Sequence, residues 1–338
     1  MGAIIEAQEL VKVFPGGIRA VDGVSFQVEE GEIFGFLGPN GAGKSTTIAM
    51  LTTLRRPTGG TARIAGLDVV RDADKVRRVI GNVSQDLAVD DDLTGYENLK
   101  LQAGFYRLPR REAEERIEEV LAMVGLTERA RDLVETYSGG MRKRLDIACG
   151  LLHRPRVLFL DEPTLGLDIQ TRREIWDYIR RLREEVGMTI FLTTHYMEEA
   201  DSLCDRIAII DRGKIVAIGT PEELKGRVGQ EVLEFEFSSG TDEAVAAAVA
   251  RIKNIPNVRE VRRGSGNGYV ATVVQGAQVV PALFEAIAGL EVKVGSVSLK
   301  RATLDDVFLY YTGRKIREEE GGEGAMRTRM IMRRVRGR

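Results

Sequence analysis

The chain has 338 residues, of which 43% are hydrophobic and 30% are charged, and its formal net charge is −2. This length suits about two domains of ~100–200 residues each, and this composition is ordinary for a globular protein. The near-neutral charge gives no overall electrostatic case for binding nucleic acid.

Cysteine usage and hydropathy bear on the compartment. Cys149 and Cys204 stand far apart and form no C-x-x-C motif, so we expect reduced thiols in the core, as in the cytosol. No apolar run approaches the ~18–20 residues of a membrane-spanning helix, and residues 1–6 lack the basic start and apolar core of a signal peptide. We therefore expect any membrane role to come through a partner.

The first 220 residues alternate apolar strand candidates with amphipathic helical stretches. This pattern predicts an α/β domain with a mainly parallel central sheet. Residues 5–14 and 24–28 alternate apolar and polar side chains, which predicts an antiparallel flank on the same core. Residues 207–210 and 215–218, separated by DRGK, predict a hairpin that closes the domain.

Three short apolar runs in this domain, residues 33–37, 157–160 and 189–193, each end where a polar motif begins. In open α/β sheets, ligands gather outside the carboxyl ends of the strands. We therefore expect Gly38, Asp161 and His195 to converge.

Between Gln85 and Tyr137 the sequence becomes highly charged, with apolar residues at helical spacing. This change predicts an inserted helical subdomain at about residues 86–155.

A second unit, residues 221–313, is predicted to be a small α+β domain. Its expected strand and helix order is that of a βαββαβ sandwich followed by one more helix. The expected strands are 232–237, 258–261, 269–274 and 292–299, and the expected helices are 242–252, 281–288 and 303–313. Residues 314–338 are Gly-rich, first acidic and then basic, which predicts a disordered tail that is either solvated or in contact with anionic lipid or a partner.

The segment GPNGAGKST fits G-x-x-x-x-G-K-[ST], a loop whose glycines let backbone N–H groups approach a polyanion. Lys44 is expected to neutralise the β- and γ-phosphates, and Ser45 to reach Mg²⁺. By itself this motif indicates only nucleoside triphosphate binding. The residues expected to hold phosphate are Gly38, Asn40, Gly41, Ala42, Gly43, Lys44, Ser45 and Thr46.

A second N–H-rich anion site is expected where the turn Ser138, Gly139, Gly140 opens a helical stretch. Two phosphate sites and one acidic strand end imply a shared ligand.

Two adjacent carboxylates follow the apolar run VLFL. Asp161 can share Mg²⁺ with Ser45, whereas Glu162 points in a different direction and can act as a general base toward the attacking water. The alternative for each acid is a capping or surface carboxylate.

His195 and Gln85 also follow apolar strands. The imidazole of His195 can donate a hydrogen bond to the γ-phosphate, with a helix-capping role as the alternative. The amide of Gln85 can touch both the metal shell and the water. His153, at a predicted helix end, is expected to be structural.

This order of motifs resembles the nucleotide-binding subunit of ATP-binding-cassette (ABC) transporters over residues 4–219. The resemblance implies that Gln85 is the family's Gln-loop residue, that residues 138–141 are its signature and that His195 is its switch histidine. It also implies that Asp161 and Glu162 are the acidic strand end and the catalytic glutamate, and that Asp168 ends the D-loop. Met141 stands where the family frequently has Gln, which puts one polar contact in question.

Phe14, in KVFPGG, falls where the family stacks an aromatic ring on adenine; the alternative is a buried strand aromatic.

The resemblance further implies that two copies pack head to tail around ATP and Mg²⁺. ATP on the Lys44 loop of one copy is then closed over by residues 138–140 of the other, which makes the chain an ATPase and a nucleotide-dependent homodimer.

The second unit narrows the resemblance. A cassette followed by GTPEELKG and closed by TLDDVFLYYTGRK resembles the daunorubicin-resistance type of exporter ATPase. This implies a motor for a separate integral membrane subunit of the type-2 export class, which carries drugs, antibiotics or lipid-like molecules, and a location at the cytoplasmic face of the membrane. Residues 86–99 are then either the receiver of the membrane subunit's coupling helix or a solvated acidic loop.

Two other functions compete with this one. A soluble cassette ATPase that acts on nucleic acid or ribosomes usually carries a long coiled coil between the two motifs, or two cassettes, and the sequence has neither. A small-molecule kinase would share the phosphate loop but not the signature or His195. We therefore expect no nucleic-acid partner. The Gly-rich stretch RRGSGNGY, with Gly264, Gly266 and Gly268, is expected to be a hairpin turn rather than a nucleotide loop.

Overall fold

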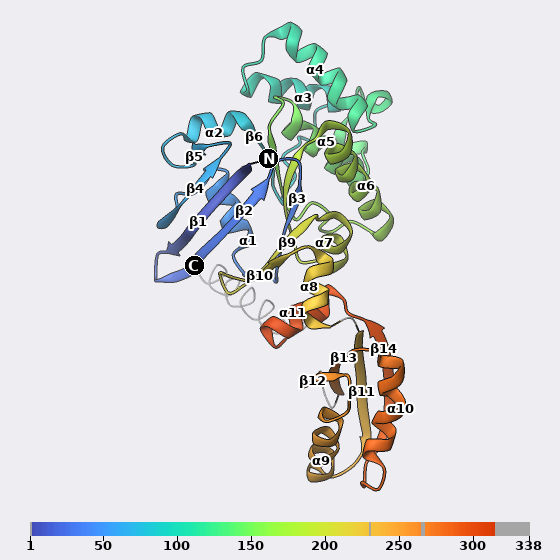
Figure 1. Cartoon of the computed structure of the whole chain (residues 1–338). Helices are drawn as coiled ribbons and strands as arrows, with labels where there is room; N and C mark the ends of the chain where they lie inside the picture. The colour runs from blue at the N-terminus through green and yellow to red at the C-terminus, as the bar shows by residue number, and fades with distance from the viewer. Residues whose placement is uncertain (1, 230, 265–267, 315–338) are drawn as a thin grey trace, which may run out of the picture. The chain divides into compact units, whose positions relative to one another are not determined.

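The computed structural model describes residues 2–229, 231–264 and 268–314 (Figure 1). The chain divides into two compact units, with the boundary between Thr220 and Pro221. Apart from Arg314, the predicted tail lies outside the described residues. No described helix combines the length and hydropathy that a membrane span requires.

The first unit is built on a six-stranded sheet in the order β10-β9-β3-β8-β7-β6. All neighbours are parallel except the hairpin of β9 and β10, which was predicted. The strands are nearly continuous apolar runs, as expected for a sheet that is covered on both faces. Their bounds are β3 (Ile33–Leu37), β6 (Ile80–Val83), β7 (Val157–Asp161), β8 (Thr189–Thr194), β9 (Arg206–Asp211) and β10 (Lys214–Gly219).

An antiparallel sheet in the order β2-β1-β4-β5 forms the predicted flank. Its strands are β1 (Ala3–Phe14), β2 (Ile18–Glu29), β4 (Gly59–Ile64) and β5 (Leu67–Asp68). β2 begins well before the expected residues 24–28. It is an edge strand whose first half carries the polar pair Arg19 and Asp22, so its apolar alternation starts late.

A cluster of phenylalanines joins the two sheets. The Phe191 ring lies 5.5–5.8 Å, centroid to centroid, from four others: Phe26, Phe34, Phe36 and Phe159. All five side chains are buried, so this cluster is the apolar centre of the unit.

Helices pack around these sheets. α1 contacts β2, β4 and β7, while α7 contacts β3 and β8. Figure 1 shows α3 and α4 together at one end of the unit, with α5 and α6 beside them. The helices are α1 (Lys44–Leu51), α2 (Ala73–Val79), α3 (Gly95–Phe105), α4 (Arg110–Met123), α5 (Gly139–Leu151), α6 (Ile169–Val186) and α7 (Met197–Leu203), with short 3-10 turns at Thr127–Arg129 and Val134–Thr136.

The second unit has the predicted βαββαβ order, with its sheet arranged β12-β13-β11-β14. A helix precedes this sandwich and another follows it. The elements are α8 (Pro221–Val228), β11 (Glu231–Ser239), α9 (Asp242–Lys253), β12 (Val258–Arg263), β13 (Gly268–Val273), α10 (Gly276–Ile287), β14 (Lys293–Arg301) and α11 (Leu304–Thr312).

The predicted start of α10 at residue 281 is wrong. Pro281 lies inside the helix, which begins at Gly276. The Glu231 carboxylate accepts a hydrogen bond from the Gly276 N–H, and a Cβ at Gly276 would lie 2.3 Å from the Leu299 side chain. The start is therefore fixed by contacts with distant strands, which outweigh the proline signal.

The phenylalanine cluster leads to a stability prediction. Phe191→Ala should lower the free energy of unfolding of the first unit by about 3–5 kcal/mol, because it leaves a cavity among four rings. The chain has one tryptophan, Trp176, so its fluorescence in a urea titration reports this unit alone. Phe105→Ala, at a side chain that is 72% exposed, is the control and should change little. Equal urea midpoints for the two variants would contradict the assignment of the cluster as the core.

Candidate active site

The phosphate loop connects the end of β3 to α1 in a path that only glycine permits at two positions. A Cβ on Gly38 would lie 2.3 Å from the Ile210 carbonyl oxygen, and one on Gly43 would lie 2.5 Å from that of Ala20. Gly43 also has a φ of 107° directly before the first turn of α1. The loop backbone is thereby fixed, with the N–H groups at the start of the helix available to an anion.

Lys44 lies beneath this loop and is only 5% exposed. Its Nζ donates to the carbonyl oxygens of Gly38 (2.7 Å) and Pro39 (3.1 Å). The same ammonium lies 3.0 Å from Glu162 Oε1. A buried ammonium is thus held at the base of the loop, and it contacts the carboxylate at the end of β7.

Ser45 and Asp161 form the second contact between α1 and β7. The Ser45 hydroxyl donates to Asp161 Oδ1 at 3.1 Å, and the Thr193 hydroxyl donates to the same oxygen. No cluster of three or more His, Cys, Asp or Glu side chains among the described residues could hold a metal ion alone. A hydroxyl and one carboxylate do fit Mg²⁺, which typically takes few protein ligands and completes its shell with water and phosphate oxygens.

Glu162 lies at the centre of the site and is 5% exposed. Its second oxygen, Oε2, lies 2.7 Å from His195 Nδ1, so one carboxylate joins Lys44 to His195. Burial disfavours its charge, but the hydrogen bond with His195 and the charge of Lys44 outweigh that penalty and hold the pKa of Glu162 below its usual value. Glu162 is therefore ionised at neutral pH.

The backbone of Glu162 is held in an uncommon conformation. Its φ is 51°, in the left-handed region that disfavours non-glycine residues. Its N–H donates to both the carbonyl and the hydroxyl oxygen of Thr193, at 3.2 and 3.1 Å. The two adjacent acids make different contacts: Asp161 accepts from Ser45 and Thr193, whereas Glu162 contacts Lys44 and His195.

A second glutamate, Glu199 on α7, holds the segment that follows Glu162. Its side chain is fully buried, and Oε1 accepts hydrogen bonds from Thr164 (2.7 Å) and the Trp176 indole (2.9 Å). Burial raises the pKa of Glu199, and the neighbouring donors oppose this only in part. Since Thr164 follows Glu162 by two residues, Glu199 ties the loop after Glu162 to α6 and α7.

The signature turn and the D-loop lie against each other. Ser138 caps α5 by accepting from the Met141 N–H at 3.2 Å, and Asp168 caps α6 by accepting from the Thr171 N–H at 3.0 Å. A Cβ on Gly140 would lie 2.6 Å from Thr171 Cγ2, so the glycine permits this close approach. Two helix N-termini are thus presented together, separately from the Lys44 network.

Comparison with known proteins agrees with this geometry. The model of the ABC transporter family matches residues 21–165, and that of the "ATP-binding protein DrrA1-3-like, C-terminal domain" matches residues 219–312. The "Daunorubicin/doxorubicin resistance ATP-binding protein DrrA" of Streptomyces peucetius is 43% identical over 95% of this chain and 96% of its own length. The chain belongs to the ATP-binding-cassette transporter family.

Other relatives of this ABC ATPase extend the comparison. The "Linearmycin resistance ATP-binding protein LnrL" of Bacillus subtilis is 38% identical over 93% of this chain and all of its own length. The solved dimeric post-hydrolysis structure of the ATP-binding cassette MJ0796, bound to ADP and Pi, is 30% identical. It covers 64% of this chain and 98% of its own, with a TM-score of 0.57. The P-loop cassette fold and the ATPase class predicted from the sequence are thereby confirmed.

Two predicted residues lie outside the network around Glu162. Gln85 is exposed in the loop that follows β6. Phe14 is half-buried at the end of β1, with Lys12 Nζ and the Arg55 guanidinium 5.6 and 5.3 Å from its ring centroid. Their expected contacts with the metal shell and with adenine stay predictions.

His153 has the structural position expected for it. It lies 2.8 Å from the Ile80 carbonyl oxygen and stacks on Tyr106 at 3.8 Å. Burial lowers its pKa, so it contributes a neutral ring to the packing of α5.

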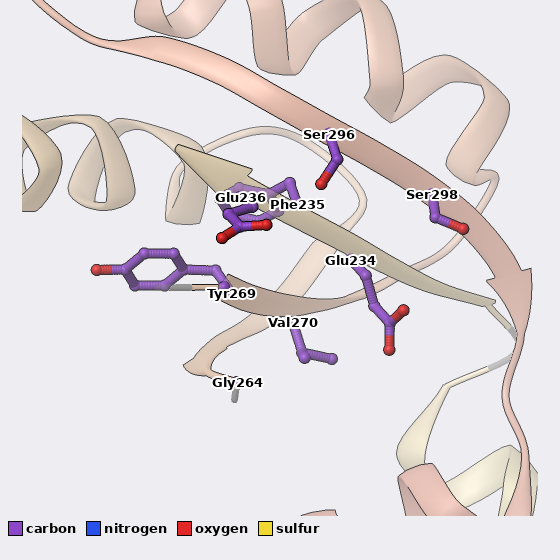
Figure 2. Close-up of a pocket in the computed structure, with 9 residues that line it drawn as sticks. Glu234, Phe235, Glu236, Gly264, Tyr269, Val270, Ser296 and Ser298 are labelled. Carbon is purple, nitrogen blue, oxygen red and sulfur yellow. The ribbon is translucent and has the colours of Figure 1, made fainter. Parts of the chain in front are cut away.

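The second unit holds a hollow of about 210 Å³ on its sheet. Figure 2 shows Glu234 and Glu236 of β11 in its wall, between Tyr269 and Val270 of β13 and the serines of β14. An acidic lining disfavours a polyphosphate. The Gly264 N–H donates to the Gly268 carbonyl at 2.8 Å, and β12 pairs with β13 in antiparallel fashion, which agrees with the predicted hairpin; Gly266 lies outside the described residues.

Sequence reasoning missed Thr193 and Glu199. Thr193 resembles any β-branched residue of a buried strand, and only its position beside β7 shows that it binds both Asp161 and Glu162. The available signal for Glu199 was its place one helical turn after His195, on the face that α7 turns toward the core.

The raised pKa of Glu199 gives a pH prediction. The folded protein keeps this proton at pH values where the unfolded chain has released it, so stability should fall as pH rises above the ordinary range of Glu. Glu199→Gln removes this titratable carboxyl group. The fall of the unfolding free energy with rising pH should then be less steep, by up to ~1.4 kcal/mol per pH unit. Urea titrations between pH 5 and 8, read by Trp176 fluorescence, measure the difference.

The control for this experiment is Glu198→Gln, at an exposed neighbour on the same helix, which should keep the wild-type slope. If the Glu199 variant also kept that slope, Glu199 would not be protonated in the folded protein.

Proposed function

We propose that this chain is the ATP-hydrolysing motor of an exporter, that it dimerises on MgATP, and that it drives a separate integral membrane subunit. The observation that carries the proposal is the joining of Lys44, Glu162 and His195 in one buried network beside Ser45 and Asp161. Two relatives named for resistance to daunorubicin, doxorubicin or linearmycin support a drug, antibiotic or lipid-like cargo.

The phosphate loop supplies the charge that hydrolysis requires. The N–H groups from Gly41 to Thr46 and the Lys44 ammonium would hold the β- and γ-phosphates. Ser45, Asp161 and Gln85 would hold Mg²⁺, which neutralises phosphate charge when bound. Since Lys44 already contacts Glu162, a bound triphosphate competes with that carboxylate for the ammonium.

Glu162 is suited to act as the general base because it is ionised and close to the phosphate loop. The attacking water would give one proton to a Glu162 oxygen as its own oxygen bonds to the γ-phosphorus. The bond between the γ-phosphorus and the oxygen that bridges it to the β-phosphate breaks in the same step, so that ADP and inorganic phosphate leave. The contact with His195 fixes one oxygen of the carboxylate, Oε2. The other oxygen, Oε1, contacts Lys44 in this structure and would face the water once the triphosphate takes its place on Lys44. His195 thereby orients the base, and we assign its imidazole the additional role of contacting the γ-phosphate.

The remaining predicted contacts are proposed to come from a second copy. Ser138, Gly139 and Gly140 form a helix N-terminus that would close over the phosphates held by the partner's Lys44 loop, and Asp168 lies beside it. Phe14 would stack on the adenine. This division requires two copies for each complete site and makes association depend on nucleotide.

The proposed membrane partner would meet the loop after Gln85. This loop and α3 expose the large apolar side chains of Leu87, Leu101 and Phe105. The chain would then lie at the cytoplasmic face of the membrane. In the same proposal, residues 1–220, with a helical subdomain at about 86–155, carry the chemistry, residues 221–313 form an accessory domain, and no nucleic acid is bound.

A soluble ABC ATPase that acts on nucleic acid or ribosomes is the alternative function. Co-purification distinguishes the two proposals. A motor should be recovered with a hydrophobic membrane polypeptide encoded nearby, whereas recovery with ribosomes or nucleic acid would support the alternative.

The decisive variant for hydrolysis is Glu162→Gln. Losing the general base should lower turnover by roughly 10²–10⁴-fold. The variant should also bind ATP more tightly, because two unit charges about 4 Å apart repel by roughly 4 kcal/mol at an effective dielectric near 20. Phosphate release without any acceptor measures turnover, and size-exclusion chromatography with MgATP should show a dimer.

Glu198→Gln is the matched control and should hydrolyse ATP as the wild type does. A Glu162→Gln protein that stays monomeric with MgATP and still hydrolyses it at the normal rate would overturn the proposed roles of both Glu162 and the dimer.

A further inference from the structure

A buried ion pair, Lys143 and Asp146, lies on α5 just after the signature turn. The two side chains are 5% and 3% exposed, and Lys143 Nζ lies 3.4 Å from Asp146 Oδ2. Neither residue belongs to the network around Glu162. Both contact the loop that carries Gln85.

Each member of the pair binds one side of that loop. Lys143 Nζ donates to the carbonyl oxygen of Ser84, the residue before Gln85, at 3.0 Å. Asp146 Oδ1 accepts from the N–H of Ala88, three residues after Gln85, at 3.3 Å. The side chains of the loop are mostly exposed, so these two bonds from α5 are what hold its backbone in place.

Stability alone is a poor explanation for such a pair. Burial lowers the pKa of Lys143 and raises that of Asp146, so removal from water acts against both charges. Apolar side chains of similar volume often stabilise a core as well as a buried ion pair does. What apolar side chains cannot do is donate to Ser84 and accept from Ala88.

We propose that Lys143 and Asp146 are positioning residues that clamp the Gln85 loop to the signature helix. The inference rests on the proposed function in one respect: the loop is taken to meet the membrane subunit and the signature to meet the partner copy's ATP. Under this clamp, a displacement of the loop moves the Ser138 turn with it. The clamp thus couples the membrane contact to closure of the nucleotide site.

The test compares three variants with the wild type. Lys143→Met and Asp146→Leu each remove one loop contact, and the exchange K143D with D146K keeps an ion pair but reverses its donor and acceptor. All three should increase amide hydrogen exchange in residues 84–88 at least tenfold. They should lower kcat at least tenfold, while the KM for ATP changes less than threefold because the Lys44 loop is intact.

The exchanged pair separates a clamp from an ordinary ion pair. If the pair only stabilised α5, the exchange would restore normal protection of residues 84–88 and normal kcat, and this result would overturn the proposal. Trp176 fluorescence checks that each variant is folded. Arg110→Met, which breaks the exposed pair with Glu114 on α4, is the control and should leave both readouts unchanged.

Hydrogen exchange is measured without nucleotide, so it tests the clamp even if the proposed motor role fails. Wild-type protection of residues 84–88 in Lys143→Met would refute the clamp, whereas absence of ATP hydrolysis by the wild type would refute the proposed function alone.

Discussion

The site depends on one buried carboxylate that contacts a cation on one side and an imidazole on the other. An ionised Glu162 that is 5% exposed would be strongly destabilising if it were alone, because few water molecules can solvate it. Lys44 and His195 offset the cost of burying this charge; Lys44 comes from the start of α1, and His195 from the residue after β8. The constraint also acts in reverse: Lys44 can be buried beneath the phosphate loop because Glu162 offsets its charge. In the proposed function, the binding of phosphate and the activation of water are therefore linked through one ammonium group.

This network exists because parallel strands end at the same edge. Asp161 and Glu162 follow β7, and His195 follows the neighbouring β8, while the phosphate loop follows β3 on the other side of β8. The hydrogen bonds of Thr193 then set the two acids apart: its hydroxyl holds the Asp161 carboxylate, and its backbone and hydroxyl oxygens hold the Glu162 N–H. The left-handed backbone of Glu162 is thus maintained by β8, and Glu199 anchors the chain that follows. The strained backbone of Glu162 is thus held by side chains that are themselves fully buried, Thr164, Thr193 and Glu199.

Much of this arrangement was predictable from the sequence, because the signals were local. The phosphate loop has a spacing that only one backbone path satisfies, and the apolar runs before Asp161 and His195 placed both at strand ends. The hairpin of β9 and β10 and the element order of the second unit followed from alternation and turn residues.

The features that sequence reasoning missed share a different cause. The start of α10 is set by Glu231 and Leu299, and the roles of Thr193 and Glu199 are set by neighbours far away in the sequence. Contacts between residues far apart in the sequence produce no local periodicity or motif spacing from which they could be predicted.

The two expected phosphate sites differ in how their helix ends are completed. At α1, Lys44 contacts Glu162 and Ser45 donates to Asp161, so the first turn is tied to the two carboxylates at the end of β7. At α5, Ser138 satisfies its own helix, and Gly140 lets the turn pack on Thr171 beside the D-loop. The contacts that complete the α5 end are therefore separate from those that hold the two acids. Lys143 and Asp146 lie on the same helix as Ser138 and connect this helix to the Gln85 loop. The proposed function and the proposed clamp therefore assign the hydrolysis to the strand ends and the closing movement to α5 with its attached loop.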